Sequence, residues 1–291
     1  MRYPAAIFLL ASVSAWADAQ PLTWEPARTI RVEEAVSSGV LAPTDPHPVF
    51  FDFFSDAILE SDGSVVFVAN SANRGVSKLG REGVYGIDRE GRPSAFVQKG
   101  DALGRGQSEV IAITSLEMRD GVPVARCLFD NRKEEEIVLG NVASDREISS
   151  ASAQHRVDSM TNDGRSIYSA GSGGTWQLVA DLTTRISGLF EGPFTGFDER
   201  KVEFGPWVVF SGSAGGYKGL FAMNMKINRL YLLLDNRASV GGRRVEDFQI
   251  SASPRSGEDF AATVNFTDGS SGIFIFRFGD SEGNPLFGRR N

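Results

Sequence analysis

The chain has few residues of the kinds that carry thiol and metal chemistry. Its 291 residues include one cysteine, Cys127, and two histidines, His47 and His155. A single cysteine cannot form an internal disulfide. A zinc site needs three or four protein ligands, usually cysteine or histidine, and this set cannot supply them without carboxylates. We therefore assign no metal-ligating residue, and we interpret Cys127, in the strand-like run 124–129, as a small buried residue.

Charge clusters and nucleotide-binding motifs are also missing. No run of five like charges occurs, and the formal net charge is −7. Nucleic acids and anionic membranes attract clustered lysine and arginine, so neither is expected as a partner. The glycine-rich segments 171–174 and 212–216 lack the lysine of a phosphate-binding loop, and no G-x-S-x-G nucleophile motif is present. The sequence therefore assigns no catalytic residue and no cofactor-binding residue, and it predicts no cofactor.

The N-terminal apolar run is too short to cross a membrane. It covers residues 5–11 and follows Arg2, whereas a spanning helix needs about 20 apolar residues. A positive start, a short apolar core and alternating small residues are typical of a cleaved signal peptide. We expect cleavage after Ala17 or Ala19, which makes residues 1–19 a signal peptide. The mature protein is then secreted or periplasmic, without membrane insertion.

The remaining sequence lacks a sustained helical period and consists of short strand-like runs. These runs are rich in β-branched and aromatic residues and are bounded by turn residues, as at 64–69, 207–210 and 272–276. Asp-Gly pairs precede several of them, at 62–63, 120–121 and 163–164. Such pairs are typical of tight hairpin turns. The chain is therefore predicted to be all-β.

The strand-like runs recur as a unit. One unit contains a Phe strand, an apolar strand, a Gly-Leu-Phe strand and a strand that ends in Asp, as at Phe194, 208–210, 219–221 and Asp235. Glycines that would introduce the second strand fall at positions 63, 121, 164, 205 and 257, at intervals of 41 to 58 residues. This is about the length of one four-stranded propeller blade.

The two ends of the sequence predict a closed ring. The last unit stops after its third strand, and residues 27–33 resemble a fourth strand. A ring closed by this N-terminal strand would leave no open sheet edge. We therefore predict a β-propeller of about five blades, within a range of four to six, over residues 20–280, followed by a polar tail at 281–291. The alternative is a β-sandwich or two smaller β domains. It explains neither the repeat interval nor the division of one unit between the two ends of the sequence.

The repeated unit resembles that of secreted bacterial β-propeller repeat proteins of uncharacterised function. Their units read F-x-x-F, G-x-V-x-F, G-I-Y and a strand ending in D. The matching residues here are Phe194-x-x-Phe197, 208–210, 219–221 and 234–235, and Phe248 with 272–274 matches less fully. The resemblance implies the fold and export, and its structural motifs supply no catalytic residues. Such proteins often end in a tail with an apolar helix, which residues 281–291 lack, so a soluble form is expected.

Two sets of repeated residues have a structural interpretation. Asp101, Asp181 and Asp235 end strands, where an aspartate can accept backbone N–H groups and fix the following turn. We prefer this role to metal binding or acid–base catalysis. The repeated aromatic residues are expected to be buried between or within blades instead of forming a ligand platform: Phe194, Phe210, Phe221, Phe248 and Phe274.

Four further aspartates could bear on function. Asp52, Asp158, Asp198 and Asp247 lie near the first strands of units, which should line a central channel. Glycoside hydrolysis needs two carboxyl groups about 5 to 10 Å apart, but a propeller fold does not by itself imply an activity. We therefore expect a monomeric, non-catalytic binding or scaffold module for a protein or glycan ligand. The alternative is a secreted polysaccharide hydrolase or lyase with channel carboxylates.

Overall fold

The computed structural model describes most of the predicted domain. The described residues are 24–26, 30–43, 49–60, 62–72, 81–103, 108–119, 122–139, 164–170, 176–186, 190, 192–204, 206–251 and 259–278. All regular elements in these ranges are β-strands, so the all-β prediction is confirmed. The same ranges contain no helix that is long and apolar enough to cross a membrane. The predicted signal peptide and the predicted tail lie outside them.

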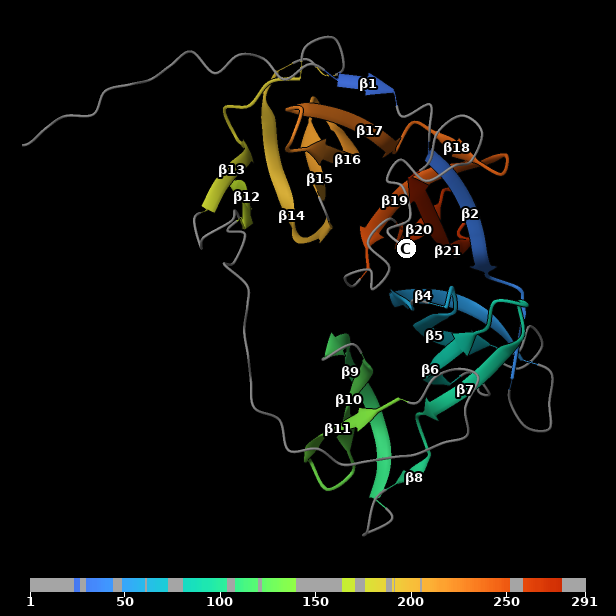
Figure 1. Ribbon diagram of the computed structural model, residues 1–291. Coiled ribbons are helices and arrows are strands. Elements are labelled where there is room, and N and C mark those ends of the chain that lie inside the picture. Colours follow the sequence, from blue (N-terminus) through green and yellow to red (C-terminus); the bar gives the residue numbers. More distant parts are fainter. Residues whose placement is uncertain are drawn as a thin grey trace, which may run out of the picture.

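The strands in the described ranges form five sheets that follow one another along the chain (Figure 1). The first sheet contains β3 (Leu41–Ala42), β4 (Val49–Leu59), β5 (Val65–Ala72), β6 (Glu82–Ile87) and β7 (Pro93–Gln98). The second contains β8 (Ala102–Leu103), β9 (Ser108–Arg119), β10 (Val122–Phe129) and β11 (Glu134–Val138). The third contains β12 (Ser166–Ala170) and β13 (Trp176–Asp181).

The last two sheets also include the N-terminal strands. The fourth sheet contains β14 (Phe194–Phe204), β15 (Trp207–Ala214), β16 (Tyr217–Asn224) and β17 (Arg229–Asp235), with β1 (Trp24–Pro26) parallel to β17. The fifth contains β18 (Ser239–Val240), β19 (Arg243–Ile250), β20 (Asp259–Phe266), β21 (Ser271–Phe278) and β2 (Ile30–Ser37). The strand predicted at residues 27–33 is thus found at 30–37, antiparallel to β21.

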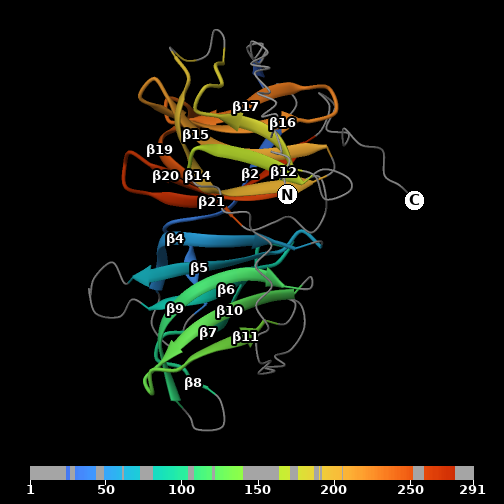
Figure 2. The ribbon, with the colours of Figure 1, turned by 90° about the vertical axis from the view of Figure 1, so that its left-hand side faces the viewer.

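The sheets pack face to face around a common middle. In Figure 1 the long strands β4, β9, β14 and β19 lie closest to that middle, and Figure 2 shows the sheets as successive layers. Four hydrophobic clusters join neighbouring sheets: third to fourth, fourth to fifth, fifth to first, and first to second. A closed ring would need a fifth cluster between the second and third sheets, and the described residues contain none. The blade number and the closure therefore stay predictions.

Four sheets share one register between their third and fourth strands. The paired positions are Gly83 with Gln98, Ser166 with Asp181, Gly219 with Asp235, and Gly272 with Ser37. Two residues before Gln98, Asp181, Asp235 and Ser37, the fourth strand has one extra residue without a partner in the third strand. These extra residues are Phe96, Val179, Leu233 and Ala35. Such a β-bulge bends the strand and increases its twist. The recurrence of this bulge shows that the sheets repeat one structural unit.

The shared register corrects one assignment from the sequence. The glycine positions 63, 121, 205 and 257 lie one or two residues before β5, β10, β15 and β20, which are second strands. Gly164 instead precedes β12, which pairs with β13 in the register of a third strand with a fourth. The spacing of glycines alone could not distinguish these two places, because a glycine can precede either kind of strand.

A glycine in the third strand makes room for an aromatic ring. Residues two apart in a strand point to the same face, and three such pairs occur: Gly83 and Tyr85, Gly219 and Phe221, and Gly272 and Phe274. A Cβ atom on Gly219 would lie 2.5 Å from the ring of Phe221. In the third sheet Ser166 takes the glycine position, and the following aromatic residue, Tyr168, is 39% exposed. The glycine therefore allows the ring to be buried.

We expect Gly219→Ala to destabilise the protein by about 1–3 kcal/mol, because the new methyl group overlaps the buried ring of Phe221. The free energy of unfolding in denaturant measures this loss. Gly196→Ala in β14 is the matched control, since its Cβ would meet nothing closer than a carbonyl oxygen at 3.9 Å. Equal effects of the two substitutions would rule out the ring contact as the reason for the glycine.

Candidate functional site

Two of the four aspartates predicted near the channel converge on one lysine. Asp198 in β14 and Asp247 in β19 both contact Lys218 in β16. Asp52 in β4 is exposed, and the structure shows its main-chain oxygen accepting a hydrogen bond of 3.4 Å from Ser271. Asp158 lies outside the described residues. The candidate site is therefore centred between the fourth and fifth sheets.

Lys218 forms a bridge between the two carboxylates. Its Nζ atom lies 2.9 Å from Asp198 Oδ2 and 2.7 Å from Asp247 Oδ1. It also donates to the main-chain oxygen of Phe248 at 3.0 Å. The hydroxyl of Ser211 donates a further hydrogen bond to Asp198. An ammonium group has three protons, so these three acceptors engage all of them.

The bridge keeps the lysine charged. Burial by itself would lower the pKa of Lys218, because it disfavours the ammonium form. The hydrogen bonds to Asp247 and Asp198 outweigh that effect and raise the pKa above the ordinary lysine value. Lys218 is therefore protonated at neutral pH. It can balance negative charge, but it cannot accept a proton from a substrate.

A cavity of about 570 Å³ opens beside the Lys218 bridge. This volume is within the range of about 300–1,000 Å³ that is usual for small-molecule sites. The polar lining comes from β14, β15, β16 and β19: Asp198, Arg200, Ser211, Lys218, Asp247 and Gln249, with apolar atoms from Phe197, Phe248 and Ile250. The guanidinium of Arg200 is in turn paired with Asp56 of β4, so the first sheet also supports this wall.

Strand alternation places the polar groups in β19. Val245, Phe248 and Ile250 are buried against the fourth sheet, while Asp247 and Gln249 between them are exposed. Asp247 was a candidate from the sequence because it lies in a first strand, where a channel was expected. Lys218 had no such signal, because it is a single lysine at the start of a strand. Its role depends on long-range pairing across two sheets.

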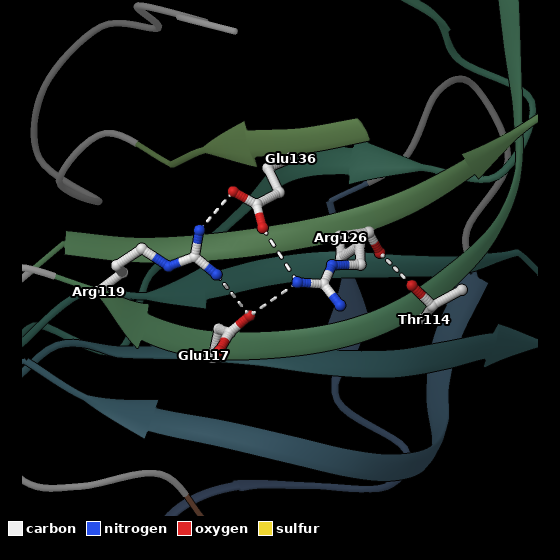
Figure 3. A network of polar contacts seen from close by, with 5 residues as sticks. All are labelled: Thr114, Glu117, Arg119, Arg126 and Glu136. Atoms are coloured by element: carbon white, nitrogen blue, oxygen red, sulfur yellow. Dashed lines mark hydrogen bonds and ion pairs between the residues drawn. The ribbon is translucent and has the colours of Figure 1, made fainter. Parts of the chain in front are cut away.

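A second polar cluster lies on the second sheet, as Figure 3 shows. Glu136 accepts from Arg119 at 2.5 Å and from Arg126 at 3.0 Å, and Glu117 accepts from Arg119 at 3.0 Å. Thr114 donates to the main-chain oxygen of Arg126 at 3.2 Å. Burial opposes ionisation of Glu136, but the two arginines outweigh it and lower its pKa. The cluster ties β9, β10 and β11 together, which is a structural role.

Asp181 and Asp235 fix turns, as predicted. Asp181 Oδ1 accepts the main-chain N–H groups of Thr183 and Thr184, both at 2.9 Å. Asp235 Oδ1 accepts the N–H of Arg237 at 3.0 Å, and Oδ2 accepts from its guanidinium. Burial raises the pKa of Asp181, but the threonine hydrogen bonds outweigh it and leave the pKa below its ordinary value. These carboxylates are engaged in holding the turns.

Asp101 needs a correction. The shared register places Gln98, at the end of β7, where the other sheets have Asp181 and Asp235. Asp101 lies three residues later and accepts the N–H of Gln98 at 2.8 Å. Asp101 therefore accepts an N–H group that precedes it in the chain, whereas Asp181 and Asp235 accept N–H groups that follow them. It does not occupy the repeat position that the sequence suggested.

The repeated phenylalanines are core residues. All five are at most 2% exposed: Phe194, Phe210, Phe221, Phe248 and Phe274. Their predicted packing role is confirmed. Cys127 is also fully buried, and burial raises the pKa of its thiol to about 12. Its predicted role as a small core residue is confirmed, and the protonated thiol is unreactive as a nucleophile.

The described residues contain no group of three His, Cys, Asp or Glu side chains that could hold a metal ion. His47 and His155 lie outside those residues, so the structure gives no position for either imidazole.

Comparisons with known proteins show only distant similarity. No family model matches the chain, and no curated protein sequence matches it. A putative oxidoreductase (glucose dehydrogenase) from Thermus thermophilus is 13% identical, with 85% of this chain and 99% of that chain covered and a TM-score of 0.32. A polysaccharide lyase is 12% identical over 82% of this chain and 61% of its own, with a TM-score of 0.28. Similarity at this level transfers neither an activity nor a ligand.

Proposed function

We propose that the chain is a non-catalytic binding module that holds a glycan in the cavity beside the Lys218 bridge. The main support for this proposal is the Lys218 bridge, in which one protonated lysine pairs with both candidate carboxylates. Carboxylate, amide and hydroxyl groups from Asp247, Gln249 and Ser211 line the cavity. These are groups that can hydrogen-bond to sugar hydroxyls.

The same geometry disfavours the hydrolase alternative. A glycosidase needs its two carboxyl groups on either side of a scissile bond. Here the ammonium of Lys218 lies between Asp198 and Asp247, where the reacting atoms of a sugar would have to be. A lyase would need a base, and the raised pKa of Lys218 keeps it protonated. Binding is therefore the better explanation of the site.

The fold proposed for this module is a five-bladed β-propeller closed by β2. Five sheets, four inter-sheet clusters and the bulge shared by four sheets support a ring of repeated blades. β2 pairs with β21 in the register that the other fourth strands use. A ring of this kind would bring the first strands, which supply Asp198 and Asp247, to its central channel.

We expect the module to be exported as a soluble monomer. The N-terminal pattern predicts cleavage after Ala17 or Ala19. Intact-mass measurement of protein recovered from the periplasm and medium of a bacterial host tests this expectation. A mature mass that still includes residues 1–17 would contradict it.

We expect Lys218→Met to weaken glycan binding at least tenfold, because the two carboxylates lose the cation that positions them. Calorimetric titration with the best oligosaccharide from an array screen measures the affinity. Lys226→Met is the matched control, since Lys226 lies in the turn after β16, outside the cavity wall. Melting curves of both variants confirm folding.

Three results would overturn the proposed function. The first is an array without any bound glycan. The second is release of new reducing or unsaturated sugar ends by the purified protein. The third is equal binding by Lys218→Met and Lys226→Met.

A further inference from the structure

The charges around the cavity do not cancel. Five charged side chains form its ion pairs: Asp56 with Arg200, and Asp198 and Asp247 with Lys218. Three carboxylates and two cations leave one net negative charge in this group. The four charged residues that line the cavity cancel, and the excess comes from Asp56, which pairs with Arg200 but does not line the cavity. A net negative charge in this group favours a cationic ligand over an anionic one.

The two cations are already used by the protein. Lys218 has three acceptors within 3.0 Å, namely Asp198, Asp247 and the main-chain oxygen of Phe248. The side chain of Arg200 is 46% exposed, but its guanidinium has Asp56 as a counter-ion. A ligand carboxylate would therefore have to compete with protein carboxylates for either cation, at a cost in affinity.

The carboxylate of Asp247 is better placed to bind a ligand than the two cations are. The side chain of Asp247 is 52% exposed and contacts Lys218 through Oδ1. A carboxylate can accept about four hydrogen bonds, so this group has capacity beyond the lysine contact. Charge-assisted hydrogen bonds from an ammonium to a carboxylate are roughly twice as strong as neutral ones.

We propose that the cavity selects glycans with a free amine, in which the ammonium of an amino sugar contacts the exposed carboxylate of Asp247. This inference rests on the proposed glycan-binding function and adds the chemical class of the sugar. Neighbouring hydroxyls of the same sugar would contact Gln249 and the other polar groups of the wall. Acidic sugars would be disfavoured, because their carboxylates would have to compete with Asp198, Asp247 and Asp56 for Lys218 and Arg200.

Calorimetric titration of the mature protein with four trisaccharides tests this selection. The probes are a glucosamine trimer, its fully N-acetylated form, a neutral glucose trimer and a galacturonate trimer. We expect the glucosamine trimer to bind at least tenfold more tightly than the other three. Equal or tighter binding of the neutral, acetylated or acidic trimer would overturn the amine selection while leaving glycan binding intact. No binding of any trimer would contradict both proposals.

Two variants test whether Asp247 is responsible for the selectivity. Asp247→Asn should reduce the preference for the glucosamine trimer over its acetylated form at least fivefold, because it removes the exposed negative charge. Glu246→Gln removes the same charge from the exposed neighbouring residue, which does not line the cavity, and should leave the preference unchanged. Melting curves verify that both variants fold. An unchanged preference in a folded Asp247→Asn protein would overturn the role given to Asp247.

Discussion

A protein that begins at residue 38 is expected to lose cooperative unfolding and to aggregate, whereas one that begins at residue 20 stays monomeric. The truncation removes β2, which pairs with β21 from Gly272 to Phe278. It also removes Val36, which is 3% exposed in the cluster between the fifth and first sheets. Loss of β2 exposes an apolar edge strand, and such edges promote aggregation. Size-exclusion chromatography and thermal melting measure both effects.

A protein that begins at residue 27 separates the two N-terminal strands. It lacks β1, which pairs with β17 through three residues, but it keeps β2. We expect this protein to remain monomeric, with a smaller decrease in melting temperature. If the protein that begins at residue 38 stays monomeric with the melting temperature of the parent, β2 does not close the structure.

Much of the fold was predictable because the local signals agree. Short β-branched and aromatic runs bounded by turn residues are strands in the structure, and the glycine before Phe221 or Phe274 corresponds to a packing need. The N-terminal strand was predictable because the last unit lacked a fourth strand. Its bounds were displaced by three residues at the start and four at the end, since a strand pattern of period two fits several registers.

The bulge in the fourth strands could not be predicted. Its extra residue is apolar in each sheet, as at Val179 and Leu233, so the sequence alternation gives no sign of it. Whether the position aligned with Asp235 is Asp101 or Gln98 depends on this register. Spacing along the chain was therefore insufficient, and the register had to come from the structure.

The site was predictable in part for a similar reason. Asp198 and Asp247 could be chosen because they lie in first strands, where a channel was expected. Their common partner, Lys218, comes from the third strand of one sheet and reaches the next sheet. No local pattern relates residues 198, 218 and 247, so the ion pairs depend on the packing of two sheets.

Phe221→Ala is expected to destabilise the protein by about 3–5 kcal/mol, the usual cost of truncating a buried phenylalanine. Phe221 is fully buried in the cluster between the third and fourth sheets. Its ring centroid lies 5.4 Å from that of Phe194 and 5.6 Å from that of Phe210. A domain is stable by only about 5–15 kcal/mol, so a large part of the total would be lost. Denaturant unfolding measures the change.

Tyr168→Ala provides a matched comparison for this substitution. Tyr168 has the same register position in β12 that Phe221 has in β16, but it is 39% exposed. Its truncation removes a ring of similar size, but less of that ring is buried in the folded protein. We therefore expect the free energy of unfolding to fall by about 1 kcal/mol or less. If Phe221→Ala instead unfolds like the parent and loses glycan binding, the aromatic residues form a ligand platform. The packing role assigned to them would then be wrong, and the binding site would have to be sought in the cluster between the third and fourth sheets.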